Sequence, residues 1–248
     1  MNVAFITGGA QGIGAAIVKK LLQEKYKVAF LDNDVAKCSL PQSKNLLPII
    51  GDVRNIIDIE NAVEKTIKHF GTITAVIANA GIFLHQELLK TSEADWEDIM
   101  AVNLKGAAFT VRAALPELIS NKNGSVVIVA SDQCFIAKKH CSAYAASKAA
   151  LGQLAKNLAI DYANHGIRVN AVCPGPTDTP MLRKLISEWS NTTPAEAINK
   201  IKNEIPLGRL AKPSEIAEVI YFLISPQSSF VTGSLYSVDG GVTAGRCF

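Results

Sequence analysis

A chain of 248 residues is long enough to bury one sizeable hydrophobic core. Although 48% of its residues are hydrophobic, no apolar run approaches the ~20 residues needed to span a bilayer, which argues against an integral membrane protein. The net charge is only +3 and the lysines and arginines are scattered along the chain, so the composition gives no support to a nucleic-acid-binding surface.

The five cysteines show no spacing typical of metal ligands, and they fit a reducing compartment. The first apolar run begins almost at Met1, so we expect no signal or transit peptide and a cytoplasmic protein. The chain contains no obvious repeats or linkers. We therefore predict one domain over residues 1–248.

Short apolar runs alternate with helical patterns along the chain, which is typical of a parallel sheet with helices on both faces. We predict an α/β, doubly wound, seven-stranded parallel sheet, with strands near residues 3–7, 27–31, 46–50, 74–79, 125–130, 167–172 and 234–238. The segment from Asp32 to Asn45 is short and contains Pro41, so it has little room for a full helix.

The first predicted strand leads into a glycine-rich turn, Gly8-Gly9-Ala10-Gln11-Gly12-Ile13-Gly14, and then into an amphipathic helix. Glycines permit a tight turn and close approach to a pyrophosphate, and the helix start offers unpaired N–H groups. A strand before the turn and a helix after it are the context that a dinucleotide site requires. We therefore predict cofactor contacts at Gly8, Gln11, Gly12, Ile13 and Gly14; a merely flexible loop is the alternative.

Asp32 stands at the end of the second predicted strand. An acid at this position can accept hydrogen bonds from the adenosine ribose hydroxyls and would repel a 2′-phosphate. No Arg or Lys lies between Gly8 and Gly14, so the sequence predicts NAD in preference to NADP. A turn or capping role for Asp32 is the alternative.

The segment Tyr-Ala-Ala-Ser-Lys places Tyr144 and Lys148 on one face of a predicted helix. An ordinary phenol has a pKa near ~10, and bringing it to ~7 requires roughly 4 kcal/mol of differential stabilisation. A cation ~4 Å away, at an effective dielectric of ~20, supplies about that much. Taken alone, this spacing more often marks a solvated helix face.

Together, these motifs give the chain a resemblance to the short-chain dehydrogenase/reductase family over essentially its whole length. Residues Thr7 to Gly14 match the family's Thr-Gly-x-x-x-Gly-x-Gly, and Val238-Asp239-Gly240-Gly241 resembles its C-terminal signature. Asn79-Ala80-Gly81 matches the family's Asn-Ala-Gly, although Ala78 stands where relatives frequently have a second Asn.

The resemblance implies a Rossmann fold and a catalytic tetrad of Asn103, Ser131, Tyr144 and Lys148. It also implies cofactor contacts at Asp52, Val53, Asn79, Ala80, Gly81, Tyr144, Lys148, Pro174, Gly175, Thr177 and Thr179. In the implied mechanism, Tyr144 is the general acid/base. Lys148 lowers the pKa of Tyr144 and binds the nicotinamide ribose, while Asn103 holds a water that connects Lys148 to solvent. No metal is required, because Lys148 and the oxidised nicotinamide stabilise the phenolate.

Substrate identity is the least visible property of the sequence. We predict a helical lid at about residues 181–206, because such segments cover nicotinamide sites and exclude water. The predicted substrate contacts are Ser131, Gln133, Tyr144, His85 and Met181. Gln133 and His85 favour a small or medium polar alcohol such as a polyol, sugar or hydroxy acid, with cyclic apolar or steroid-like alcohols as alternatives. The basic run 138–140 is either a solvated loop or an attractor of anionic substrates.

These features predict an NAD-dependent oxidoreductase that interconverts a secondary alcohol and a ketone. Two alternatives stay open at this point. One is an NADP-dependent ketoreductase such as an acyl-carrier 3-oxoacyl reductase, and the other is a non-catalytic dinucleotide sensor. The family resemblance also implies a homo-oligomer, commonly a tetramer.

Overall fold

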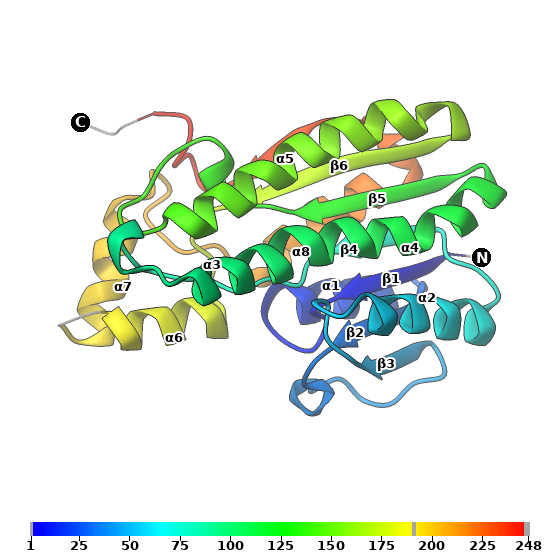
Figure 1. Ribbon diagram of the computed structural model, residues 1–248, viewed down its shortest axis with the longest axis horizontal. Helices are drawn as coiled ribbons and strands as arrows, with labels where there is room; N and C mark the ends of the chain where they lie inside the picture. The colour runs from blue at the N-terminus through cyan, green and yellow to red at the C-terminus, as the bar shows by residue number, and fades with distance from the viewer. Residues whose placement is uncertain (1, 190–191, 246–248) are drawn as a thin grey trace.

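The protein folds around one seven-stranded sheet in the order β3-β2-β1-β4-β5-β6-β7, as seen in a computed structural model that describes residues 2–189 and 192–245 (Figure 1). All neighbouring strands pair in parallel. The strands are β1 (Val3–Thr7), β2 (Lys27–Asp32), β3 (Leu46–Ile50), β4 (Ala75–Ala78), β5 (Gly124–Val129), β6 (Ile167–Pro174) and β7 (Leu235–Val238). The predicted doubly wound sheet is thus confirmed, and every predicted strand is present.

Helices cover both faces of the sheet (Figure 1). On one face lie α1 (Gly12–Gln23) and α8 (Pro213–Ile224), and on the other lie α2 (Ile56–Phe70), α4 (Gly106–Asn121) and α5 (Ser142–Tyr162). The two faces have separate hydrophobic clusters, and Phe5 and Ile6, consecutive in β1, belong to different ones. Strand side chains alternate between faces, so a strand buried on both sides becomes a continuous apolar run.

Local signals fix the ends of these helices. The Asn55 side chain accepts a hydrogen bond from the Ile57 N–H and caps α2, which ends at Gly71 with φ of 88°. The crossover between β2 and β3 contains only a short 3-10 turn, Val35–Lys37, as the brevity of this segment predicts. Further 3-10 turns span Leu88–Lys90, Asp132–Cys134, Ala163–His165 and Pro226–Ser228.

An uninterrupted helical run connects α3 (Glu93–Ile99) to α4 through a π-helical segment, Met100–Lys105. A π-helical segment is rare and occurs frequently at functional sites. It contains Asn103, which is completely buried. The sequence pattern predicted a helix in this region but not the π-helical segment.

Two helices, α6 (Pro180–Trp189) and α7 (Pro194–Asn203), stand beyond one end of the sheet (Figure 1). They follow β6 and therefore lie at the carboxyl edge of the strands, where doubly wound folds bind ligands. The predicted lid segment is therefore helical over most of its length. Among the described residues, no helix is long and apolar enough to cross a membrane.

Candidate active site

The glycine turn after β1 is tightly packed and depends on its glycines. Gly8 and Gly12 have φ of 70° and 57°, a region that favours glycine, and a Cβ on Gly14 would lie 1.8 Å from the Gly8 carbonyl oxygen. Gln11 precedes the first turn of α1 without a side-chain cap, and that turn, which begins Gly12-Ile13-Gly14, contains no acidic residue. The first N–H groups of α1 thus retain the capacity to bind an anion.

Asp32 is held against this turn. One of its carboxylate oxygens accepts a hydrogen bond from the Ala10 N–H at 2.9 Å, and the other accepts from the Asp34 N–H at 3.0 Å. The end of β2 is thereby fixed beside the glycine turn. These contacts also give Asp32 the turn-stabilising role that the sequence left open.

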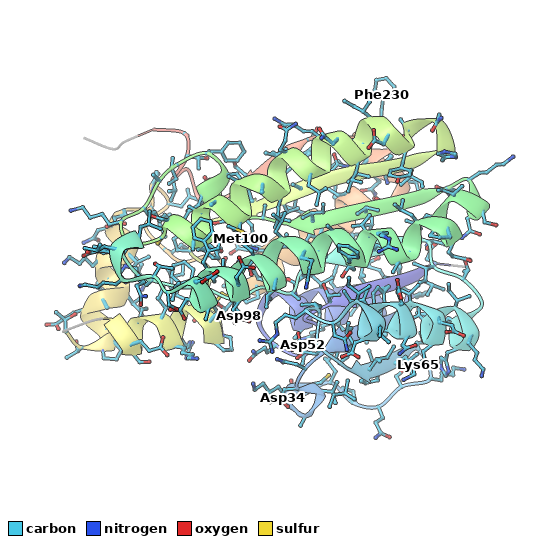
Figure 2. The ribbon with its side chains drawn as sticks, viewed as in Figure 1. Asp34, Asp52, Lys65, Asp98, Met100 and Phe230 are labelled. Carbon is cyan, nitrogen blue, oxygen red and sulfur yellow. The ribbon has the colours of Figure 1, made fainter. Side chains whose placement is uncertain are left out.

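Asp52 and Val53 lie after β3, on the same side of the molecule. The Arg54 guanidinium binds both Asp52 oxygens and also donates to Asp98 at 2.7 Å, which connects this loop to α3 (Figure 2). The hydrogen bond from Arg54 holds the pKa of Asp52 below its usual range. Val53 is buried and packs against Gly106, where an added Cβ would lie 3.0 Å from it.

Asn79 and Ala80 tie β4 to the glycine turn. The Asn79 amide donates to the carbonyl oxygens of Gly8 at 2.9 Å and Thr7 at 3.0 Å. The Thr7 hydroxyl accepts from the backbone N–H groups of Asn79 and Ala80. Gly81 faces the centre of the site, because a Cβ there would lie 3.4 Å from the Lys148 ammonium nitrogen.

Three members of the predicted tetrad meet at the carboxyl end of β5. Tyr144 and Lys148 both lie on the buried face of α5, with the Lys148 Nζ 5.8 Å from the centre of the Tyr144 ring. The Lys148 ammonium donates to the Val129 carbonyl oxygen at 2.9 Å. Ser131 follows β5, and its side chain lowers the pKa of the Tyr144 phenol.

Asn103, the fourth member, connects two elements instead of facing the phenol. Its side-chain oxygen accepts from the Ile82 N–H at 2.8 Å. Its amide donates at 3.0 Å to both the Ile82 carbonyl oxygen and the Ser147 hydroxyl. Since Ser147 precedes Lys148 in α5, Asn103 fixes the loop after β4 against the helix that carries the lysine.

Burial governs the proton affinities of the two central groups. It raises the pKa of Tyr144 above the ordinary range of a phenol, and the Ser131 side chain offsets only part of that rise. Burial also lowers the pKa of Lys148 to about 8. In the protein alone, the neutral phenol is therefore favoured at pH 7, so the sequence-based expectation of a phenol with a lowered pKa is not met without a bound cofactor.

The segment after β6 closes the site on another side. Pro174 ends β6, and Gly175 packs closely on the β7 end, where an added Cβ would lie 2.7 Å from the Asp239 Cα. The Thr177 hydroxyl donates to the Gly175 carbonyl oxygen at 2.9 Å. Thr179 lies against the glycine turn, with its methyl carbon 3.5 Å from the position of a Cβ on Gly12.

This arrangement combines a glycine turn suited to a pyrophosphate, an acid beside it, and a buried Ser-Tyr-Lys group. A family model described as "Enoyl-(Acyl carrier protein) reductase" matches residues 8–243. The chain belongs to the short-chain dehydrogenase/reductase family. It is therefore an oxidoreductase that acts on CH–OH groups of small molecules and binds a nicotinamide dinucleotide.

Individual relatives agree with this assignment along their whole length. The chain is 36% identical to 2-(S)-hydroxypropyl-CoM dehydrogenase 3 of Xanthobacter autotrophicus, over 98% of this chain and 97% of that protein. It is 38% identical to the 3-oxoacyl-[acyl-carrier-protein] reductase FabG of Thermotoga maritima, over 97% of each chain. The ligand-free aldohexose dehydrogenase (AldT) of Thermoplasma acidophilum has a TM-score of 0.92 at 33% identity, covering 100% of this chain and 96% of that one.

The residues predicted to contact the substrate of this short-chain dehydrogenase/reductase range from buried to exposed. Gln133 is buried beside Ser131, and its side-chain oxygen has no hydrogen-bond partner within the described structure. His85 lies in the loop after β4 and stacks edge-on against His140, with ring centres 5.2 Å apart. Met181 begins α6 and is 43% exposed. Phe83, from the same loop as His85, packs on the Tyr144 ring, with the two ring centres 4.4 Å apart.

Two members of the basic run 138–140 lie beside carboxylates. Lys138 forms an ion pair with buried Asp132 at 2.6 Å, and His140 lies 3.6 Å from the Glu87 carboxylate. Lys139 is exposed. The pairing offsets the charge of Lys138. It also places Asp132, which the sequence analysis did not single out, next to Ser131 and in contact with the basic run.

Proposed function

We propose that this short-chain dehydrogenase/reductase uses NAD to interconvert a secondary alcohol and a ketone, with Tyr144 as the general acid/base. The observation that carries the proposal is the convergence of Ser131, Tyr144 and Lys148 at the carboxyl end of β5, on the same edge of the sheet as the glycine turn. Ligands of doubly wound sheets bind at this edge.

Each of these residues has a distinct role in the proposal. The substrate oxygen accepts a hydrogen bond from the Ser131 hydroxyl and exchanges a proton with the Tyr144 hydroxyl. The Lys148 ammonium contacts the nicotinamide ribose, and its positive charge favours the phenolate. The bound nicotinamide supplies the hydride acceptor at C4 and, when oxidised, a second positive charge. Asn103 holds the water that links Lys148 to solvent.

The cofactor preference rests on Asp32. Its carboxylate is fixed beside the glycine turn by the Ala10 N–H, so an additional phosphate on the adenosine ribose would meet a negative charge. The other proposed cofactor contacts are Gly8, Gln11, Gly12, Ile13, Gly14, Asp52, Val53, Asn79, Ala80, Gly81, Pro174, Gly175, Thr177 and Thr179.

For the substrate, we propose a small or medium polar alcohol such as a polyol, sugar or hydroxy acid. The unpaired oxygen of buried Gln133 supports a substrate with a second hydrogen-bond donor, because a buried polar atom left without a partner is unfavourable. The structurally similar aldohexose dehydrogenase also acts, by its name, on a sugar. In this proposal the segment at about 181–206, of which residues 190 and 191 lie outside the described structure, is the lid, and Met181 contacts the substrate.

The decisive test of the reaction is Tyr144→Phe. Purified protein is assayed by nicotinamide absorbance against polyols, hydroxy acids, cyclic alcohols and sterols. We expect turnover with NAD that falls at least ~100-fold in the variant, the usual scale of general acid/base catalysis. Turnover that survives the substitution would remove Tyr144 from the proposed role.

Cofactor choice is tested by Asp32→Ala, with Asp34→Ala as the matched control. Asp34 lies two residues away and is paired with Lys37 at the surface, so its loss changes charge without touching the glycine turn. We expect Asp32→Ala, but not Asp34→Ala, to lower kcat/KM with NAD. The ratio of kcat/KM with NAD to kcat/KM with NADP should fall about tenfold or more relative to the wild-type protein. An unchanged ratio would contradict the assignment.

An acyl-carrier 3-oxoacyl reductase is the second candidate, favoured by the 38% identity to a protein of that name. It predicts reduction of a 3-oxoacyl thioester with NADPH faster than with NADH. A dinucleotide sensor predicts binding of NAD with no Tyr144-dependent turnover. The same assay panel therefore separates all three functions.

A further inference from the structure

Asp132 is a buried carboxylate that the proposed reaction does not use. It follows Ser131 directly and is only 2% exposed. The Ser131 hydroxyl donates to one of its oxygens at 2.9 Å, and the Lys138 ammonium donates to the other at 2.6 Å. The result is a chain of contacts from a half-exposed lysine, through a buried acid, to the hydroxyl beside Tyr144.

The hydrogen bond from Ser131 to Asp132 competes with any hydrogen bond from Ser131 to a substrate. A hydroxyl donates only one hydrogen bond, and here that bond goes to Asp132. The Ser131 oxygen also accepts from the Gln133 N–H at 3.2 Å. To donate to a ketone oxygen, the Ser131 hydroxyl must turn away from Asp132, and a charged acceptor holds a proton more strongly than a neutral one.

The same pair acts on Tyr144 through charge. The Asp132 carboxylate raises the pKa of the phenol, and the adjacent Ser131 side chain lowers it. Other titratable groups that face the ring are Lys148 from α5, Cys141 immediately before that helix, and Cys134 from the turn after β5. His85 lies on the loop that packs Phe83 against the ring. Lys138 carries the opposite charge and is paired with Asp132 at 2.6 Å.

We infer that Asp132 and Lys138 are positioning residues for the Ser131–Tyr144 pair: Asp132 orients the Ser131 hydroxyl, and Lys138 limits the negative charge beside the phenol. The inference rests on the proposed function for its kinetic readout. An ion pair kept this close to a buried site is not explained by stability, because desolvation commonly outweighs the attraction between buried charges.

The test is a cycle of Asp132→Asn, Lys138→Met and the double variant, measured as kcat for alcohol oxidation against pH. Oxidation requires the phenolate, so activity rises with pH through the Tyr144 ionisation. We expect the midpoint to fall by about one pH unit in Asp132→Asn and to rise by a similar amount in Lys138→Met, since one charge is removed near the phenol. The double variant returns toward the wild-type midpoint.

The matched control is Lys139→Met, which removes the same charge from the adjacent, exposed position. We expect no shift of the midpoint in this variant. Midpoints that stay unchanged in both Asp132→Asn and Lys138→Met would overturn the inference, as would a shift of equal size in Lys139→Met. If Asp132→Asn fails to fold, Lys138→Met still decides the question, because the lysine side chain is 33% exposed.

A second readout separates this inference from the proposed function. The ionisation of Tyr144 is followed by ultraviolet difference absorbance of each variant against the same variant carrying Tyr144→Phe. If the Tyr144 pKa shifts in opposite directions in Asp132→Asn and Lys138→Met but no turnover is seen, the positioning role is supported and the proposed reaction is rejected. If turnover is seen but the Tyr144 pKa is the same in all variants, the proposed reaction is supported and the positioning role is rejected.

Discussion

At the scale of single residues, burial has the same consequence for Tyr144 and Lys148 although it moves their pKa values in opposite directions. In each case burial favours the neutral form relative to the same group in water, although Lys148, with a pKa of about 8, is still mostly protonated at pH 7. An estimate from sequence spacing contains only the attraction between phenolate and ammonium. It omits desolvation, and it omits the hydrogen bond from Lys148 to the Val129 carbonyl oxygen. The spacing therefore predicts the partners but not the sign of the shift.

This burial predicts a pH dependence of stability. The folded pKa of Lys148 is about 8, below the model-peptide value of 10.5. Between these two pH values the unfolded chain binds more protons at this residue, so its contribution makes the free energy of unfolding rise with pH. We expect the rise to be absent in Lys148→Met. Urea unfolding of both proteins at pH 8 and pH 10 measures the difference in slope, and equal slopes would contradict the prediction.

The glycine turn gives a second prediction for a single residue. Gly14→Ala places a Cβ 1.8 Å from the Gly8 carbonyl oxygen, so the turn must shift. We expect NADH affinity to fall at least ~10-fold, because the shift displaces the N–H groups that face the phosphate. Gly71→Ala is the control, since nothing lies within 4 Å of its added Cβ. It strains the end of α2 by about 1 kcal/mol and leaves affinity unchanged.

Gly14→Ala and its control Gly71→Ala both replace a glycine by alanine, so a difference between them reports the position of the substitution. Fluorescence titration with NADH and thermal unfolding are measured on each. Equal affinity in the two variants would mean that the glycine turn does not hold the dinucleotide.

At the scale of elements, the π-helical segment between α3 and α4 is the feature that the sequence did not predict. Its residue Asn103 makes three hydrogen bonds, to both backbone groups of Ile82 and to the Ser147 hydroxyl. Asn103→Ala leaves these buried groups without partners, and each costs about 1–3 kcal/mol. We expect a loss of about 3 kcal/mol or more in the free energy of unfolding.

Ser147→Ala is the comparison for that variant. It removes the contact with Asn103 and the hydrogen bond from Ser147 to the Tyr144 carbonyl oxygen, but leaves both Ile82 contacts in place. We expect a smaller loss of stability than in Asn103→Ala. Denaturant unfolding measures both, and a larger loss in Ser147→Ala would show that Asn103 does not fix the loop to α5.

The elements also show why some features were predictable from sequence. Strands such as β1, buried on both faces, appear as continuous apolar runs, and the glycine turn has a sequence signature of its own. The π-helical segment has no such signature, because it continues an ordinary helical pattern. The pairing of Asp132 with Lys138 depends on how the loop after β5 folds back, which no periodicity encodes.

At the scale of the whole molecule, the helices and loops that cover the sheet leave some apolar side chains exposed on the surface. Ile160, near the end of α5, is 79% exposed, and Phe230 is fully exposed and points away from the body (Figure 2). The two come from neighbouring segments, because a Cβ on Gly233 would lie 3.5 Å from the Ala159 Cβ. Large apolar side chains exposed on adjacent segments are candidates for an interaction surface.

We therefore predict that the protein is a homo-oligomer, a tetramer by family resemblance, and that Ile160 and Phe230 lie at a contact between its subunits. A lysine at either position places a charge in an apolar contact, which is strongly unfavourable when unpaired. We expect Ile160→Lys and Phe230→Lys to shift the protein to smaller species in size-exclusion chromatography with light scattering at micromolar concentration. Ile57→Lys, on α2 and 63% exposed, is the matched control and keeps the wild-type mass. A monomeric wild-type protein would contradict the prediction. A wild-type oligomer that survives both substitutions would place its contacts elsewhere on the surface.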